Sequence, residues 1–295
     1  MLEATDVRVR LGGKDVLAGV TLRVQPGEIV GLVAPNGSGK STLLTTLAGR
    51  WGGLAGDRPG DLAGDQAGCR LGSPAERSGD SRPDSQPGGQ PDSRLSSPAS
   101  GLLQADGISP RDARQYHQQV VLVESGRAPL VSSMQVCDQM ALVARRWGQP
   151  AGTIGRIVRL CEMADYLGKT PRQLSDGMAR QAALALGYLT GARYLLLDEP
   201  FTSLDPTRVL LNERIMRRLA DAGCGLLVSS HVLSEVDRLC DRVVFLKDGR
   251  AVEPRGIGAP TSGPVARAVA SHVGAPREAS SAQDIYQELF GENGR

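Results

Sequence analysis

The sequence predicts an α/β fold with a parallel sheet, because apolar runs typical of buried strands end in polar residues and alternate with helical spacing. These runs cover residues 28–33, 194–197 and 225–229. Ligands of parallel α/β sheets gather beyond the carboxyl ends of the strands. The residues that follow these runs are therefore the first candidates for a functional site.

The length and composition exclude several classes of protein. A chain of 295 residues can bury one large core or two modest ones. A formal net charge of +2 and an aromatic content of 3% argue against a nucleic-acid partner. No apolar stretch approaches the ~18 residues of a membrane-spanning helix, and residues 1–6 lack the layout of a secretory signal. The cysteines are odd in number without C-x-x-C spacing, which predicts free thiols in a reducing compartment.

The N-terminal region predicts an antiparallel pair of strands. Residues 5–10 and 20–24 alternate between apolar and polar side chains. Pro26 and Gly27 then form a turn into the buried strand at 28–33.

The strand at 28–33 leads into a glycine-rich loop, residues 34–42, and then into helical spacing over 43–48. This context is typical of a phosphate-binding (Walker A) loop, whose backbone N–H groups cradle a polyphosphate at the positive end of a helix. Lys40 would meet the β- and γ-phosphates, and Ser41 would offer a hydroxyl to Mg²⁺. Ala34 replaces the first glycine of the usual motif, which a backbone at negative φ tolerates. The alternative is a glycine-rich turn that precedes a helix by chance. The predicted nucleotide-binding residues here are Asn36, Gly37, Ser38, Gly39, Lys40, Ser41 and Thr42.

The strand at 194–197 ends in two adjacent carboxylates, Asp198 and Glu199, and Pro200 stops it. Because side chains alternate along a strand, the two carboxylates cannot do the same work. Asp198 is predicted to hold Mg²⁺ through its water shell, and Glu199 to orient or deprotonate the water that attacks the γ-phosphate. Acidic residues also end buried strands without any role, so the phosphate loop in the same chain carries this prediction.

The middle of the chain divides into an insertion and a helical region. Residues 52–100 contain no Val, Ile, Phe, Tyr, Met or Lys, too little apolar surface to offset the entropy of ordering, so 51–100 is predicted to be a low-complexity, disordered insertion. A strand and turn at 101–107, a short helix at 110–117 and a strand at 120–123 follow. Helical spacing at 133–147, 153–163 and 177–189 predicts a helical subdomain over 126–190.

These segments, in this order, resemble the nucleotide-binding subunit of an ABC transporter. Leu174-Ser175-Asp176-Gly177-Met178 stands for the LSGGQ signature, Ser203-Leu204-Asp205 for the D-loop, and His231 for the switch histidine. The resemblance implies a P-loop NTPase ABC cassette with a RecA-like core, an antiparallel β subdomain and a helical signature subdomain. The cassette would span 1–252, followed by a tail at 253–295 with a short amphipathic helix over 282–290.

The resemblance also implies a dimer in which each ATP lies between the phosphate loop of one cassette and the signature of the other. Ser175, Asp176, Gly177 and Asp205 are then expected at the nucleotide. His231 would contact the γ-phosphate and keep Glu199 and the water aligned, which makes Glu199 and His231 the predicted catalytic residues. On the residues alone, an ordinary helix N-cap is the better interpretation of Ser175 or Asp176, and a solvated loop residue is the more common one for His231; the position of the signature before Asp198 and the residues that flank His231 favour the functional interpretation.

Three departures from the family pattern lie around the expected nucleotide. Leu11 aligns with the aromatic residue that stacks on adenine, so it offers apolar contact without a π-face. Glu124, after the strand at 120–123, aligns with the Q-loop glutamine and can ligate Mg²⁺. The predicted metal ligands are therefore Ser41, Asp198 and Glu124. Asp176 replaces a signature glycine and brings negative charge toward phosphate.

The expected function is ATP binding and hydrolysis with Mg²⁺ by a subunit at the cytoplasmic face of the membrane. A second cassette and an integral membrane permease are the expected partners, and Val131, Met134 and Val136 are candidate permease contacts. The stretch at 133–147 and the C-terminal ending resemble the ABC-2 exporter branch.

One alternative is a regulatory, nucleotide-gated cassette whose hydrolysis is impaired by its departures from the family pattern. Another is an ABC ATPase acting on DNA or ribosomes, which predicts paired cassettes or basic insertions that the sequence lacks.

Overall fold

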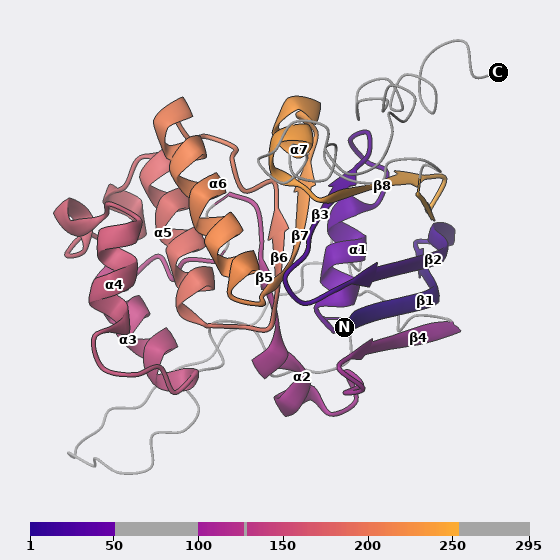
Figure 1. The fold of residues 1–295 in the computed structure, drawn as a ribbon, viewed down its shortest axis with the longest axis horizontal. Helices are drawn as coiled ribbons and strands as arrows, with labels where there is room; N and C mark the ends of the chain where they lie inside the picture. Colours follow the sequence, from indigo (N-terminus) through magenta and orange to yellow (C-terminus); the bar gives the residue numbers. More distant parts are fainter. Residues whose placement is uncertain (51–99, 127–128, 254–295) are drawn as a thin grey trace, which may run out of the picture.

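The computed structural model describes residues 1–50, 100–126 and 129–253, which form two sheets and a set of helices around them (Figure 1). The predicted insertion at 51–100 lies outside the described residues apart from Ser100. The tail at 253–295, with its predicted helix, lies outside them apart from Glu253.

The larger sheet has six strands in the order β5-β6-β7-β3-β8-β9, and all pair in parallel except the last. Its strands are β3 (Ile29–Val33), β5 (Val120–Val123), β6 (Tyr194–Asp198), β7 (Gly225–Ser230), β8 (Arg242–Lys247) and β9 (Arg250–Val252). Val33 pairs with Ser230, and Asp198 pairs with Ser229. The carboxyl ends of β3, β6 and β7 therefore meet at one edge, as the sequence predicted.

The smaller sheet is antiparallel and has the strand order β2-β1-β4. Its strands are β1 (Leu2–Leu11), β2 (Lys14–Val24) and β4 (Ser100–Ala105). Helix α1 (Lys40–Leu47) lies between the two sheets (Figure 1). Leu43 and Leu44 on α1 share one buried cluster with Val20 of β2 and Leu227 of β7, so the phosphate loop is anchored on both sides.

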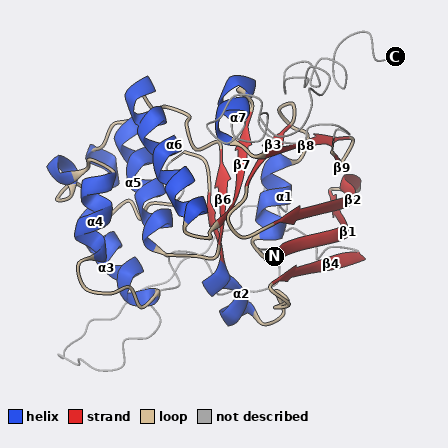
Figure 2. Cartoon of the chain, viewed as in Figure 1, coloured by secondary structure: helices blue, strands red, loops and turns tan. Residues whose placement is uncertain are grey.

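Most of the other helices gather on the side of the larger sheet that faces away from the smaller sheet (Figure 2). The remaining helices and 3-10 turns of the described residues are α2 (Ala113–Gln119), α3 (Val136–Arg146), α4 (Thr153–Leu160), η2 (Ala164–Tyr166), η3 (Pro171–Gln173), α5 (Asp176–Leu189), α6 (Pro206–Asp221) and α7 (Leu233–Leu239). The second buried cluster joins α3, α5 and α6 to the sheet. Helix α6 and strands β8 and β9 add to the predicted elements.

Two predicted helices are shorter in the structure, and each has a local cause. Helix α3 begins at Val136 because the Gln139 amide binds the backbone of Val131 and Met134, which folds the preceding residues into a turn. Helix α4 ends at Leu160, since Glu162 takes a positive φ of 50° that a helix does not allow.

Helix α5 packs closely on the sheet through small residues. A Cβ on Gly187 would lie 2.4 Å from Cγ2 of Val123, on β5. Ala179, Ala182, Ala183 and Ala185 of the same helix are fully or almost fully buried. Close packing of this kind leaves little room for α5 to move without moving the strands.

Gly187→Ala should destabilise the fold by about 1–3 kcal/mol, because the new methyl group must displace the buried side chain of Val123. Thermal or urea unfolding measures the change. Gly155→Ala on α4 is the matched control: its Cβ meets nothing closer than Arg159 Nη1 at 3.6 Å, and removing a helix-interior glycine should stabilise by up to about 1 kcal/mol. Equal effects of both substitutions would contradict the packing described for α5.

Candidate functional site

The loop between β3 and α1 has the backbone of an anion cradle. Gly37 and Gly39 adopt positive φ values of 77° and 99°, which favour glycine. Gly39 is the N-cap of α1, and no side chain from the described residues caps this end of the helix. The first N–H groups of α1 therefore lie open at the positive end of the helix dipole, which suits a phosphate.

Two side chains of this loop add to the cradle. Lys40 is buried, and its Nζ donates to the carbonyl oxygens of Ala34 at 2.8 Å and Pro35 at 3.2 Å. Burial lowers the pKa of Lys40, while the nearby carboxylates Glu199 and Asp198 oppose that shift. Ser38 Oγ is buried without a hydrogen-bond partner among the described residues, which leaves it available to a ligand oxygen.

Asp198 joins three segments through its carboxylate. Ser41 Oγ, on α1, donates to Asp198 Oδ2 at 2.9 Å, and Ser229 Oγ, on β7, donates to Asp198 Oδ1 at 2.7 Å. Asp198 is 6% exposed. The structure thus brings together two of the predicted metal ligands, a hydroxyl and a carboxylate, and hard oxygens of this kind fit Mg²⁺.

Glu199 lies beside His231, in surroundings different from those of Asp198. Its Oε1 is 3.4 Å from His231 Nδ1, and Thr202 Oγ1 donates to its Oε2 at 3.5 Å. Its backbone N–H donates to Ser229 Oγ at 2.9 Å. Glu199 has a φ of 45°, a left-handed conformation that is uncommon outside glycine and clusters at functional sites. Ser229 thus orders both acidic residues at the end of β6.

Glu124 follows β5, and its carboxylate is already paired. Arg50 Nη1, just after α1, donates to Glu124 Oε1 at 2.9 Å, and both side chains are about 40% exposed. Arg50 was not among the predicted site residues. The role of Glu124 as a metal ligand stays a prediction.

The family model described as ABC transporter matches residues 17–57 and 93–202. The chain belongs to this family. It is similar to the hemin import ATP-binding protein HmuV of Pseudomonas fluorescens, with 33% identity over 89% of this chain and 88% of that one. It is also similar to the lantibiotic transport ATP-binding protein SrtF of Streptococcus pyogenes, with 24% identity over 85% of this chain and 89% of that one. The Nod factor export ATP-binding protein I of Burkholderia lata is 29% identical over 85% of this chain and 69% of that one.

Solved structures share the fold. An ATP-binding subunit of an ABC transporter superposes with a TM-score of 0.70 at 22% identity, covering 98% of this chain and 99% of that one. A dimeric bacterial ABC transporter cassette superposes with a TM-score of 0.64 at 18% identity, covering 87% of this chain and all of the other. The predicted fold, a P-loop ABC cassette with its antiparallel and helical parts, is confirmed.

The segments predicted to be the signature and the D-loop of this ABC cassette lie together at the start of α5. Ser175 is the N-cap, and its Oγ accepts from the Met178 N–H at 3.2 Å. Asp176 is the first helical residue, where a negative charge favours the helix dipole. A Cβ on Gly177 would lie 2.7 Å from the Ser203 carbonyl oxygen, so the signature packs directly on the D-loop backbone. The interpretation of Ser175 as a helix N-cap is therefore confirmed, and its contact with nucleotide stays a prediction.

The remaining predicted nucleotide-binding residues lie on β1, on α1 and the loop before it, and at the start of α6. Asp205 is the N-cap of α6, and its Oδ1 accepts from the Arg208 N–H at 3.0 Å. Leu11 ends β1 and packs, partly buried, against the cluster around α1. Thr42, on α1, is half-buried, and Asn36 is exposed at the start of the loop. Their contacts with nucleotide stay predictions.

Sequence reasoning missed Arg180, a buried cation on α5. It is 1% exposed and donates to the backbone carbonyl oxygens of Pro200, Glu124 and Asp198 at 3.0, 2.5 and 2.6 Å. Burial lowers the pKa of its guanidinium to about 10, against the opposing effects of Tyr188, Asp198 and Glu199. The available signal was an arginine among the small apolar residues of the signature helix.

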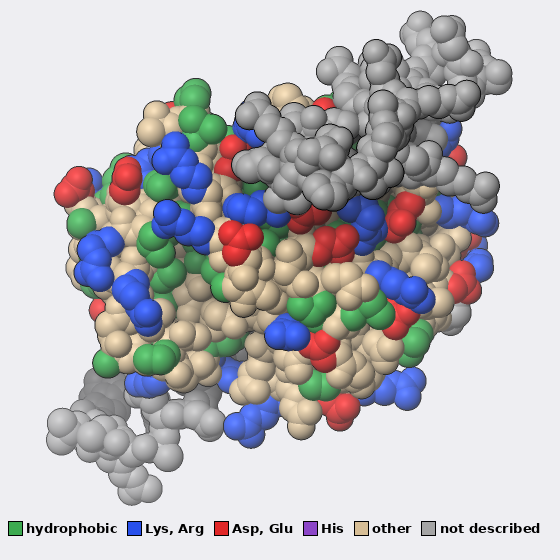
Figure 3. All heavy atoms as spheres, viewed as in Figure 1, with side chains coloured by type: hydrophobic (Ala, Val, Ile, Leu, Met, Phe, Trp, Pro, Cys, Tyr) green, Lys and Arg blue, Asp and Glu red, His purple; other side chains and the backbone are tan. Residues whose placement is uncertain are grey.

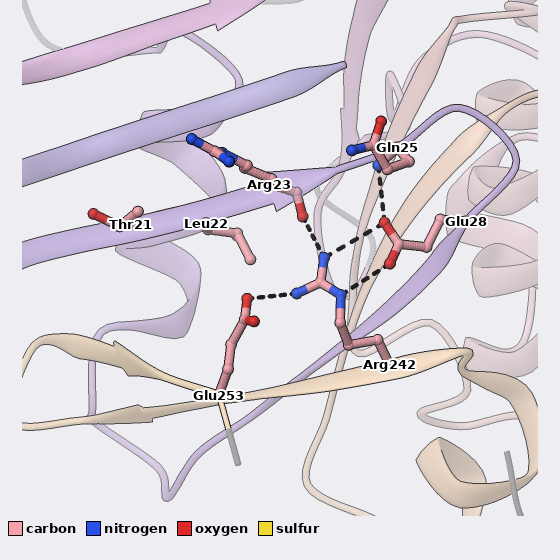
Figure 4. Close-up of a pocket in the computed structure, with 7 residues that line it drawn as sticks. All are labelled: Thr21, Leu22, Arg23, Gln25, Glu28, Arg242 and Glu253. Carbon is pink, nitrogen blue, oxygen red and sulfur yellow. Dashed lines mark hydrogen bonds and ion pairs between the residues drawn. The ribbon is translucent and has the colours of Figure 1, made fainter. Parts of the chain in front are cut away.

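A pocket of about 500 Å³ lies near the amino ends of β3 and β8, at the opposite end of the strands from the phosphate loop (Figure 4). Arg242 crosses it and donates to Glu28 Oε1 at 2.9 Å, to Glu253 Oε1 at 2.5 Å and to the Arg23 carbonyl at 2.6 Å. These contacts of Arg242 hold β8 against the turn before β3. Arg242 therefore stabilises the fold at this end of the strands.

The surface in view in Figure 3 carries interspersed basic and acidic side chains. Among the described residues, no helix is both long and apolar enough to cross a membrane. The cysteines at 137, 161, 224 and 240 are free thiols, as predicted, and Cys69 lies outside the described residues.

Ser229→Ala should lower the free energy of unfolding by about 1–3 kcal/mol, because a fully buried hydroxyl that bonds Asp198 and Glu199 is lost. Chemical denaturation measures this change. Thr202→Ala removes only an exposed contact of 3.5 Å with Glu199. Its free energy of unfolding should stay within about 0.5 kcal/mol of the wild-type value. A Ser229→Ala protein as stable as the Thr202→Ala protein would contradict the bridging role.

Proposed function

We propose that this cassette binds ATP with Mg²⁺ and hydrolyses it in a dimer, to power transport through a separate membrane protein. The observation that carries the proposal is the hydrogen bond of 2.9 Å between Ser41 of the phosphate loop and Asp198 at the end of β6. That contact joins the two halves of a nucleotide site that lie far apart in the sequence.

The phosphates would lie over the loop at 36–42, on the open N–H groups of α1. Lys40 would exchange its contacts with the Ala34 and Pro35 carbonyls for the β- and γ-phosphates. The buried Ser38 hydroxyl would donate to a phosphate oxygen. Leu11 would lend apolar contact to the base.

Ser41 and Asp198 would hold Mg²⁺, with Glu124 as a further oxygen, and the ion would neutralise phosphate charge. Glu199 would accept a proton from the attacking water as its oxygen bonds to the γ-phosphorus and the bond to the bridging β–γ oxygen breaks. His231, 3.4 Å from Glu199 Oε1, would hold that carboxylate in line.

The second cassette would complete the site. The signature residues Ser175, Asp176 and Gly177, together with Asp205, would face the ATP held by the partner. The start of α5 offers N–H groups for a γ-phosphate. A solved cassette of this fold is dimeric, and a second structure of that same cassette is described as a post-hydrolysis state bound to ADP and phosphate, which supports this arrangement.

The transport partner would be an integral membrane permease that holds the cassette at the cytoplasmic face. Similar chains are described as subunits for hemin import, lantibiotic transport and Nod factor export. We propose export, on the resemblance of the stretch at 133–147 and the ending to the ABC-2 branch. Uptake and efflux by vesicles that hold the cassette with its membrane partner would decide the direction.

The second candidate is a hydrolysis-impaired cassette that regulates an active partner. The observation that favours it is the Glu124–Arg50 ion pair, which places a charged pair where the family has a glutamine. ATPase turnover of the purified chain, alone and with its membrane partner, separates the two candidates, because only the first predicts turnover by this chain.

Glu199→Gln should bind ATP normally and accumulate an ATP-bound dimer with little turnover, because the amide cannot accept the proton. Phosphate release and size-exclusion chromatography with ATP measure the two effects. Lys40→Ala is the contrasting variant, and its ATP affinity should fall at least about tenfold as phosphate charge goes uncompensated. Wild-type turnover by the Glu199→Gln protein would remove Glu199 from the proposed chemistry.

Arg50→Gln should increase the affinity for Mg²⁺ in the presence of ATP by about threefold to tenfold, because it frees the Glu124 carboxylate. Titration of ATPase activity or of ATP binding with Mg²⁺ measures the midpoint. Arg50→Gln combined with Glu124→Gln is the matched control and should lose that gain. An unchanged midpoint in Arg50→Gln would show that Glu124 does not reach the ion.

A further inference from the structure

We propose that Arg180 is a positioning residue for hydrolysis: from the signature helix it holds the backbone on both sides of Glu199 and at Glu124. This inference rests on the proposed role of Glu199 and goes beyond it. Arg180 would link the signature, which is expected to face the ATP bound by the partner cassette, with the residues that are expected to act on the ATP bound by the same cassette.

The contacts of Arg180 enclose the Glu199 residue. Its Nη2 donates to the carbonyl oxygen of Asp198 at 2.6 Å, and its Nε donates to that of Pro200 at 3.0 Å. These are the residues immediately before and after Glu199. Its Nη1 donates to the Glu124 carbonyl at 2.5 Å, at the end of the neighbouring strand β5. One planar guanidinium therefore fixes three points around the predicted water-activating carboxylate.

The backbone that Arg180 holds needs an external restraint. Glu199 has a φ of 45°, a conformation that persists in a non-glycine residue only where its surroundings over-determine it. The N–H of Glu199 is held by Ser229 from β7, whereas both flanking carbonyls are held by Arg180. Loss of Arg180 would free the carbonyl groups of Asp198 and Pro200. The Glu199 carboxylate between them would then sample positions away from the attacking water.

A merely structural role accounts less well for a charge at this position. Arg180 is 1% exposed, and its hydrogen bonds among the described residues all go to backbone carbonyl oxygens. A buried cation costs free energy unless charges nearby compensate it. Tyr188, Asp198 and Glu199 oppose the lowering of the Arg180 pKa by burial, so the acidic pair is part of the surroundings that stabilise this cation.

The helix that carries Arg180 can transmit displacement. Gly187 and Val123 leave no space between α5 and β5, and Gly177 rests against the D-loop carbonyl of Ser203. A shift of the signature when ATP is clamped would therefore move Arg180 together with the carbonyls it holds.

The test is the full chain with Arg180→Gln, which keeps a hydrogen-bonding amide but removes the charge and the fork, and with Arg180→Lys, which keeps the charge. Turnover, ATP affinity, KM and thermal stability are measured for both and for wild type. Arg217→Gln is the matched control, because Arg217 also joins two elements through a backbone carbonyl, that of Leu239, and through Asp241, away from the acidic pair.

We expect kcat of Arg180→Gln to fall about tenfold or more, with ATP affinity and KM within about twofold, since the hydrogen bonds of Arg180 within the described ranges go to Asp198, Pro200 and Glu124 and not to the phosphate loop. The kcat of Arg180→Lys should fall less than that of Arg180→Gln. Arg217→Gln should keep wild-type kcat. Wild-type kcat in Arg180→Gln, or parallel losses of ATP affinity and kcat, would overturn the proposal. The same loss in Arg217→Gln at equal stability would also overturn it.

Glu199→Gln, measured beside these variants, separates the two proposals. If Glu199→Gln is inactive while Arg180→Gln turns over normally, only the positioning role fails. If Glu199→Gln turns over normally, the role proposed for Glu199 fails, and with it the reason for a loss in Arg180→Gln.

Discussion

The hydrogen bonds that Asp198 accepts from Ser41 and Ser229 are the interaction on which the site depends. They exist because β6, β7 and β3 pair in parallel and in this order, so that their carboxyl ends reach one edge of the sheet. The phosphate loop follows β3, the acidic pair ends β6, and His231 follows β7. Parallel pairing therefore converts three distant segments into one local arrangement.

The edge of this sheet concentrates charge that a protein interior disfavours. Lys40 and Arg180 are both buried, and burial lowers the pKa of each, while Asp198 and Glu199 act in the opposite direction. The two cations and two carboxylates thus compensate one another across the loop, the strand end and the signature helix. Separating a buried charge from the charges that compensate it costs free energy. The geometry of the site is therefore linked to the stability of the fold.

The rest of the architecture keeps that arrangement in place. Helix α1 is held between two sheets through Leu43 and Leu44, so the loop before it has a fixed base. Helix α5 lies against the sheet through alanines and Gly187, so the signature has a fixed distance from the acidic pair. Ser175 and Asp205 cap the helices that would meet a partner cassette, and the same polar groups that stabilise the monomer stand at its expected interface.

Residue types at fixed local spacing are enough to predict the class of fold, which the structure confirms, and to locate the expected phosphate loop, acidic pair and signature in the chain. Glycines at 37 and 39, an apolar run before Asp198 and a serine before Asp176 encode their own local structure. The partners of those residues, in contrast, depend on how distant segments pack together. The pairing of Glu124 with Arg50, the turn that shortens α3 and the contacts of Arg180 join positions 5 to 74 residues apart. No periodicity reports such contacts, since they depend on which strands lie side by side and on which carbonyls a buried side chain can reach.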